Sequence, residues 1–115
     1  MKIKQYDIWL ANLQPRRGTE PGKIRPVVII QTNILNEFHH STVICPITTD
    51  VVEKSHYLRV HLNKGLLDKP SDILVDQIRA IDNRRFVKRI SQLRVDQIEK
   101  LRSNLSVILD LDTSH

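Results

Sequence analysis

The sequence predicts a small mostly β or α+β domain, built from several short strands and one C-terminal amphipathic helix. Short apolar runs, separated by turn-forming residues, make up most of the chain. From Val95 onward the apolar residues recur instead at intervals of three and four, which is typical of a helix. The 115 residues, 40% of them hydrophobic, suit a single domain over residues 1–115. A small barrel capped by a helix fits this plan.

The first strand is predicted at Ile8–Leu13 and ends before Pro15. A long, basic loop that contains Gly18 follows it. The second strand is predicted at Pro26–Gln31, where an unbroken Val-Val-Ile-Ile run indicates burial on both faces. We expect Pro26 at the start of this strand, where no N–H donor is needed.

The middle of the chain predicts a helical turn and three further extended segments. The turn is expected at Asn33–Phe38, and a strand at Thr42–Ile47, where Pro46 favours an edge position or a bulge. Tyr57–Leu62 alternates apolar and polar residues, as a strand with one wet face does. Ile73–Ile81 mixes apolar residues with polar ones that we expect at a site or a turn. These polar residues are Asp76, Gln77 and Arg79.

The predicted terminal helix starts at Val95 and has about sixteen residues, which gives a length of roughly 24 Å. Asp96 in its first turn suits the helix dipole, whereas Arg94 is a poor capping residue. The single cysteine, Cys45, lies in an apolar run. We therefore expect it to be a buried, inert thiol with no internal disulfide.

The formal charge of +5 is concentrated in two segments. Residues 1–25 carry six Lys or Arg against two acids, and residues 79–94 carry six against Asp82 alone. Such segments favour a phosphate-rich partner, because each neutralised phosphate releases counterions. A solvated basic face is the alternative, and charge alone does not separate RNA from DNA or from an acidic protein.

Nothing near the start resembles an export signal, since Met1–Tyr6 is polar and carries two lysines. The longest apolar run, Val27–Ile30, is too short to span a bilayer. We expect a cytoplasmic protein without a membrane partner.

Four ordered segments resemble the MazF/PemK family of toxins. GTEPGKIRPVVIIQ, at Gly18–Gln31, is similar to the family's loop and strand signature of Gly, Glu, Gln, one or two glycines and Arg-Pro. YDIWLANLQP at Tyr6–Pro15, CPITT at Cys45–Thr49 and ILVDQIRAID at Ile73–Asp82 agree in order and spacing. Together with the stretches between them, they cover most of residues 5–110.

The resemblance implies an SH3-like small barrel of the CcdB/PemK type, assembled as a homodimer whose groove binds single-stranded RNA. It implies a toxin of a type II toxin–antitoxin system that cleaves mRNA at short specific sequences. The partner would be a cognate antitoxin with an acidic C-terminal segment, and the toxin–antitoxin complex would bind DNA.

The chemistry needs no metal, because RNA carries its own nucleophile in the 2′-hydroxyl. Arg25 matches the family's essential arginine, and we expect it to stabilise charge on the phosphate. Thr48 matches the second catalytic position, where its hydroxyl could contact the phosphate or position the 2′-hydroxyl. Six further residues are expected to bind RNA: Gly18, Glu20, Lys23, Thr49, Asp76 and Gln77.

The general base is left open between Glu20 and Asp76. One branch of the family uses a histidine and an arginine for acid–base chemistry, but Thr19 and Leu74 occupy those positions here. Pro21 stands where the family has Gln, which removes an amide that could touch RNA.

No cofactor is expected, because the five histidines have no ligand set beside them that is typical of a metal site. Two other functions remain open. One is a non-enzymatic toxin of the CcdB type, which binds a topoisomerase, and the other is a plain RNA-binding domain.

Overall fold

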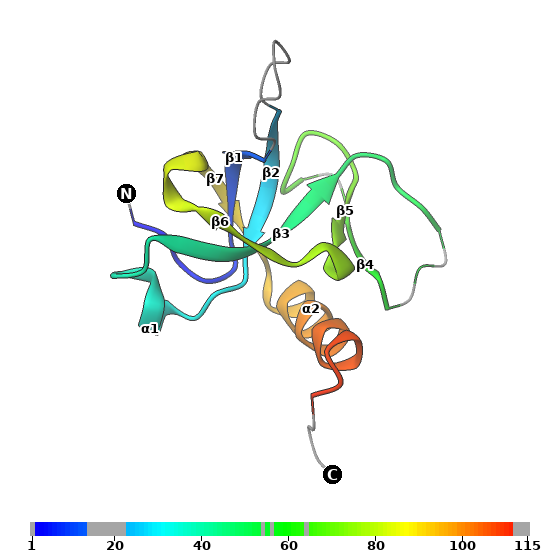
Figure 1. The fold of residues 1–115 in the computed structure, drawn as a ribbon. Coiled ribbons are helices and arrows are strands. Elements are labelled where there is room, and N and C mark those ends of the chain that lie inside the picture. Colours follow the sequence, from blue (N-terminus) through cyan, green and yellow to red (C-terminus); the bar gives the residue numbers. More distant parts are fainter. Residues whose placement is uncertain (1, 14–22, 54, 56, 64, 112–115) are drawn as a thin grey trace, which may run out of the picture.

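The computed structural model describes residues 2–13, 23–53, 55, 57–63 and 65–111. Its main feature is a seven-stranded antiparallel sheet with one long helix packed against it (Figure 1). The strands follow the order β4-β5-β3-β2-β1-β7, and β6 pairs with β3. The strands are β1 (Asp7–Asn12), β2 (Ile24–Ile29), β3 (Ser41–Thr48), β4 (Arg59–Leu62), β5 (Ser71–Leu74), β6 (Arg79–Asp82) and β7 (Phe86–Gln92). The helices are α1 (Asn33–Asn36) and α2 (Val95–Ile108), with 3-10 turns η1 (Val75–Gln77) and η2 (Asn83–Arg85).

The β2 run is buried on both faces, as its continuous apolar sequence predicts. Val27, Val28 and Ile29 are all fully buried. Val28 belongs to an apolar layer between the sheet and α2, whereas Val27 and Ile29 belong to a second layer on the opposite face. The two layers make the sheet the centre of the molecule.

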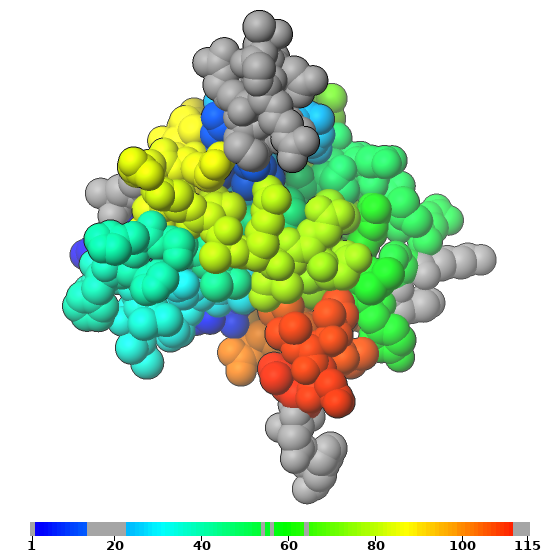
Figure 2. All heavy atoms as spheres, in the orientation of Figure 1, coloured from blue at the N-terminus to red at the C-terminus, as the bar shows by residue number. Residues whose placement is uncertain are grey.

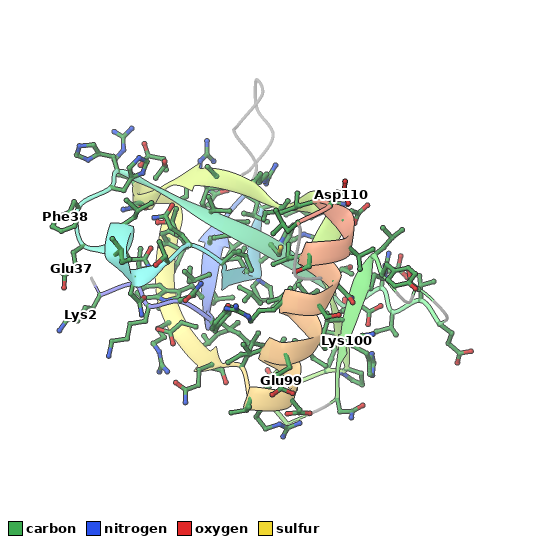
Figure 3. All side chains as sticks on the ribbon, turned by 90° about the horizontal axis from the view of Figure 1, so that it is seen from below. Lys2, Glu37, Phe38, Glu99, Lys100 and Asp110 are labelled. Carbon is green, nitrogen blue, oxygen red and sulfur yellow. The ribbon has the colours of Figure 1, made fainter. Side chains whose placement is uncertain are left out.

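The helix α2 closes the first layer, and its residues Leu101 and Leu105 are buried there. Each such side chain contributes roughly 1.5–3 kcal/mol by leaving water. Figure 3 shows α2 lying across the sheet, with Glu99 and Lys100 on its exposed surface. In the space-filling view, α2 forms the lower part of the face, below the yellow-green residues (Figure 2).

Two side chains explain how α2 is joined to the rest of the chain. The Gln97 side chain accepts a hydrogen bond from the Arg94 N–H at 2.8 Å, which is the glutamine half of a capping box and fixes the start of the helix. The Asn104 amide, buried in the interface, donates to the Arg59 carbonyl at 3.1 Å. It thereby occupies part of the outer edge of β4, a strand at the end of the sheet.

The predicted position of Pro26 is wrong, because it is the third residue of β2. The Leu13 N–H donates to the Lys23 carbonyl. The β2 residues that form hydrogen bonds with β1 are therefore those with odd residue numbers, such as Arg25 and Val27. Pro26 therefore turns its nitrogen toward β3, and the β2–β3 ladder begins only at Val27. The N–H that Pro26 lacks would point to a place where β2 and β3 are no longer paired, so no hydrogen bond of the β2–β3 ladder is lost.

Pro46 follows the same logic on the other side of β3. An edge position for it is wrong, because β3 lies inside the sheet. Its nitrogen faces the side where β6 stops pairing at Ile44 and β5 starts pairing at Ile47. On this side of β3, the pairing is therefore interrupted at Pro46, between the end of the β6 ladder and the start of the β5 ladder.

The remaining predictions differ mainly in extent. The strand expected at Tyr57–Leu62 is only Arg59–Leu62, and the run Ile73–Ile81 is divided by the turn η1. The strand β7 was not predicted. It pairs with the edge of β1 through two register shifts, and Lys88 and Arg89 interrupt its apolar pattern.

Candidate active site

The strand register brings Arg25 and Thr48 together. Val27 lies opposite Pro46 in the antiparallel β2–β3 pair. Two residues further along each strand, the same register places Arg25 across from Thr48, with both side chains on the face of Val27 and Pro46. These two residues are not adjacent in the ladder, because the strands separate there.

The separation has a simple cause: each strand end is held by a different neighbour. Arg25 pairs with Ala11 of β1, and Thr48 pairs with Asp72 of β5. Between the diverging ends lies a hollow of about 340 Å³, which we call the fork hollow. Its lining residues are Leu13, Lys23, Arg25, Pro46, Ile47, Thr48, Leu74, Gln77 and Arg79.

The charge of the fork hollow is positive. Lys23, Arg25 and Arg79 line it, and none of its lining residues in the described part of the chain is acidic. Within the part of the chain that the structure describes, none of the three forms an ion pair. Arg79 is oriented by donating from Nη2 to the Leu13 carbonyl at 3.2 Å. An anion that entered the hollow would meet guanidinium donors already facing it.

The Thr48 hydroxyl has a defined role in the local backbone. Its Oγ1 accepts a hydrogen bond from the Asp50 N–H at 3.1 Å. A hydroxyl that accepts one bond keeps its own hydrogen for donation. Thr48 can therefore donate to an oxygen of a bound anion while its rotamer is held by the following turn.

The other predicted site residues do not all lie in the fork hollow. Lys23 and Gln77 line the fork hollow with Arg25 and Thr48. Thr49 points elsewhere and lines a second hollow of about 490 Å³ beside Leu10 and Lys88.

Asp76 is exposed, but it is absent from the lining of the fork hollow. The Asp76 charge affects the Cys45 thiol: burial raises the pKa of this thiol to about 12, and the Asp76 charge contributes a smaller part of the increase. The prediction of a buried Cys45 is confirmed. Gly18 and Glu20, with Thr19 and Pro21, lie outside the described residues.

From the sequence, Arg79 is expected at a site or a turn, but no role in binding or catalysis is predicted for it. The signal was available, because Arg79 stands two residues before the buried Ile81 in a strand, so both point to the same face. Ile44, which lies opposite Arg79 in the β3–β6 pair, is on the same face of the sheet and belongs to the same apolar layer as Ile81.

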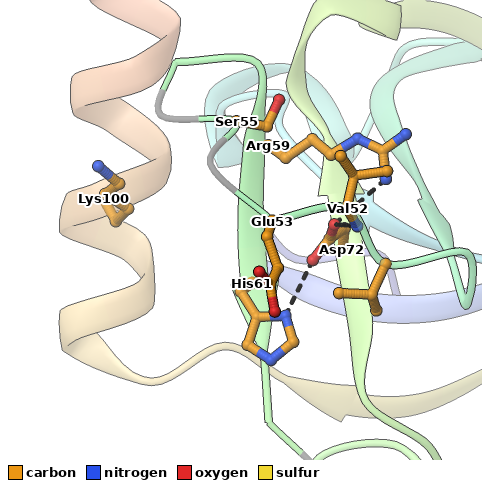
Figure 4. Close-up of a pocket in the computed structure, with 8 residues that line it drawn as sticks. Val52, Glu53, Ser55, Arg59, His61, Asp72 and Lys100 are labelled. Atoms are coloured by element: carbon orange, nitrogen blue, oxygen red, sulfur yellow. Dashed lines mark hydrogen bonds and ion pairs between the residues drawn. The ribbon is translucent and has the colours of Figure 1, made fainter.

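A second polar group lies beside the fork hollow, around the buried carboxylate of Asp72. Its Oδ1 accepts from His61 Nδ1 at 2.9 Å, and its Oδ2 accepts from Arg59 at 3.2 Å and from the Val52 N–H at 3.1 Å (Figure 4). We call Asp72, Arg59 and His61 the Asp72 cluster. No sequence spacing indicated it, because its members meet only through the β4–β5 register, which places His61 opposite Asp72.

The contacts of the Asp72 cluster determine the ionisation of its carboxyl. Burial is the largest influence and would raise the pKa of Asp72. The hydrogen bonds from His61, the Val52 N–H and Arg59 together outweigh burial and hold this pKa below its ordinary value. The carboxylate is therefore charged at neutral pH and paired within the protein.

A family model described as "PemK-like, MazF-like toxin of type II toxin-antitoxin system" matches residues 4–109 of this chain. The chain belongs to this family. It is 31% identical over 113 residues to the Endoribonuclease MazF of Staphylococcus saprophyticus, covering 96% of this chain and 94% of that relative.

Solved MazF structures share the fold. A MazE–MazF structure from Deinococcus radiodurans superposes with a TM-score of 0.84 at 22% identity, covering 97% of this chain and 99% of that one. The Mycobacterium tuberculosis toxin MazF-mt6 gives 0.77 at 24% identity, with 92% and 98% covered. The predicted fold class is confirmed, with a barrel-like sheet that does not close in the described residues. No helix among those residues has the length and apolar character to cross a membrane.

Proposed function

We propose that this chain is a metal-independent endoribonuclease that cleaves single-stranded mRNA at specific sequences as the toxin of its toxin–antitoxin system. Family membership supports the toxin role, and the relative named Endoribonuclease MazF supports the reaction class. The observation that carries the proposal is the meeting of Arg25 and Thr48 in one hollow, which Lys23 and Arg79 also line.

The proposed reaction uses the RNA 2′-hydroxyl as the nucleophile. It attacks the adjacent phosphorus, and the bond to the 5′-oxygen breaks, which leaves a 2′,3′-cyclic phosphate and a 5′-hydroxyl. Arg25 donates to the non-bridging oxygens as negative charge grows on them. Thr48 donates its free hydroxyl hydrogen to the same phosphate.

The remaining site residues take binding roles in this proposal. Lys23 and Gln77 contact RNA from the rim of the fork hollow, where they lie. Gly18, Thr49 and Asp76 extend the contact to flanking nucleotides. Glu20 and Asp76 are the two candidates that we propose for accepting the 2′ proton.

The proposed partners follow from the same family. The Deinococcus radiodurans structure is titled a MazE–MazF structure, and we propose that this chain likewise binds an antitoxin, through an acidic C-terminal segment. The three cations of the fork hollow favour such a segment as a competitor of RNA. We further propose a cytoplasmic homodimer whose antitoxin complex binds DNA.

Incubating the purified protein with a long single-stranded RNA in excess EDTA tests the proposal. Discrete fragments with 5′-hydroxyl ends are expected, and mapping those ends gives the cleavage sequence. Growth arrest on expression while bulk RNA stays whole would favour the CcdB-type alternative. Binding with a salt slope of about −0.7 per phosphate, but without cutting, would favour a plain RNA-binding domain.

A further inference from the structure

The turn that follows Thr48 is held by the Asp72 cluster rather than by the regular sheet. Arg59 donates through one Nη1 nitrogen to two acceptors, the Asp50 carbonyl at 2.7 Å and the Asp72 carboxylate at 3.2 Å. The Val52 N–H donates to the same carboxylate oxygen at 3.1 Å. Both anchored residues lie within four positions of Thr48.

The register explains why one carboxylate can serve this turn. Asp72 lies directly across from Thr48 in the β3–β5 pair and directly across from His61 in the β4–β5 pair. It therefore stands between the strand that carries Thr48 and the strand that carries the two basic side chains. Figure 4 shows Arg59 and His61, both from β4, and Val52, from the turn after β3, converging on it.

The burial of the Asp72 cluster makes it a firm anchor. The Asp72 side chain is 2% exposed and that of Arg59 is 22% exposed. A charged hydrogen bond shielded from water is stronger than one on the surface, and its loss leaves the partner unsatisfied. The turn is thus held at Val52 by the buried Asp72 carboxylate. At the exposed Asp50 carbonyl it is held by Arg59, whose guanidinium Asp72 orients.

The same turn orients the proposed catalytic hydroxyl. Thr48 Oγ1 accepts from the Asp50 N–H, while the Asp50 carbonyl accepts from Arg59. Any movement of the Asp50 backbone would therefore change both bonds. The line of contacts runs from Asp72 through Arg59 and Asp50 to the Thr48 hydroxyl.

We propose that Asp72 and Arg59 are positioning residues for RNA cleavage, which hold the Thr48–Val52 turn so that the Thr48 hydroxyl faces the scissile phosphate. This inference rests on the proposed ribonuclease function. Neither residue lines the fork hollow, so neither contacts the phosphate held there. Their removal should affect the rate of the bound complex more than RNA binding.

The first test is steady-state cleavage of one short RNA by Arg59→Ala and Asp72→Ala. We expect kcat to fall about 10-fold or more, because a small misplacement of a catalytic group is costly, with KM changed less than about two-fold. Arg59→Lys should recover part of kcat, since an ammonium can still donate to both acceptors. Asp82→Ala is the matched control, because it removes an exposed carboxylate paired with Arg84 and should leave kcat unchanged.

The second test separates an effect through Thr48 from a general loss of structure. In a Thr48→Val background, Arg59→Ala should lower kcat by less than about two-fold further, because the hydroxyl it positions is already gone. An undiminished loss in that background, or a change in KM alone, would overturn the proposal.

The third measurement does not depend on activity. Amide hydrogen exchange, followed by NMR without RNA, should speed up at least about 10-fold at Asp50 and Val52 in Arg59→Ala and stay unchanged in Asp82→Ala. If the wild-type chain cuts no RNA, the ribonuclease function fails. Exchange at Asp50 and Val52 then decides alone whether the Asp72 cluster holds the turn, and unchanged exchange rejects it.

Discussion

The fork hollow and the Asp72 cluster lie side by side at the end of β3, yet they treat charge in opposite ways. In the Asp72 cluster, one buried carboxylate accepts from an arginine, a histidine and a backbone N–H. In the fork hollow, the described lining residues include three cations and no acid. Both regions use side chains from neighbouring strands: the register of β2 with β3 forms the fork hollow, and the register of β4 with β5 forms the Asp72 cluster.

The difference shows how a small basic protein can separate structural charge from functional charge. A charge that is already paired inside the fold stabilises and orients the backbone, and it has little left to offer a ligand. A guanidinium without a protein carboxylate keeps its donors for a phosphate. The same residue type, arginine, therefore has different expected roles at positions 25 and 59.

The largest expected effect is on catalysis. Arg25→Ala should lower the cleavage rate by on the order of 10²-fold or more, because it removes a preorganised group that stabilises charge on the phosphate. The melting temperature should change little, since Arg25 forms no ion pair with a described residue. Rates on one RNA substrate and thermal melts measure the two quantities. Lys100→Ala, which removes an exposed cation beside the Asp72 cluster, is the control, and near-normal turnover of Arg25→Ala would remove its assigned role.

The next effect is on stability. Asp72→Ala should lower the free energy of unfolding by about 1–3 kcal/mol, because Arg59 and the Val52 N–H lose a buried acceptor. Urea unfolding followed by circular dichroism measures it. Glu99→Ala serves as the comparison, because it removes an exposed carboxylate that forms no ion pair with a described residue. Equal stability of the two variants would contradict the structural role given to the Asp72 cluster.

A smaller effect is expected in the salt dependence of RNA binding. Arg79→Ala removes one cation from the fork hollow, so the slope of log K against log salt should become shallower by about 0.7 for single-stranded RNA. Binding is measured in EDTA with a 2′-deoxy substrate that resists cleavage. An unaltered slope would show that Arg79 neutralises no phosphate.

The smallest effect is on acid stability. The pKa of Asp72 is lowered in the fold, so the unfolded chain binds its proton first as the pH falls. The stabilisation is complete above the ordinary aspartate value of 3.8 and is lost as the pH drops through the lower folded value. Below about pH 4, the melting temperature of the wild-type chain should therefore fall more steeply than that of Asp72→Ala. Parallel curves would show that Asp72 does not titrate with unfolding.

The sequence was most informative where burial determines structure. The continuous apolar runs of β2 and β3 and the stripe of α2 predicted these elements, because a buried face demands them. The strand β7 could not be read in the same way. Its residues Val87 to Arg89 are exposed, and its position is set by the ladder with β1 rather than by its own pattern.

The candidate site shows the same division. Arg25 and Thr48 were proposed from a resemblance, but their common hollow follows from a register that no local pattern contains. Thr49 shows the limit of adjacency, since it lies one residue beyond the end of β3 and lines the second hollow instead. The Asp72 cluster joins side chains from β4 and β5 with a backbone N–H from the preceding turn, and only the pairing of those strands reveals it.

The central claim is that the RNA supplies the nucleophile while Arg25 and Thr48 act on one phosphodiester. The most direct test is to map one cleavage site, replace the single ribose on its 5′ side by 2′-deoxyribose, and repeat the digestion in EDTA. The account predicts that cutting stops at that bond while an unmodified site on the same strand is cut at the normal rate. Continued cutting at the deoxy position would contradict it.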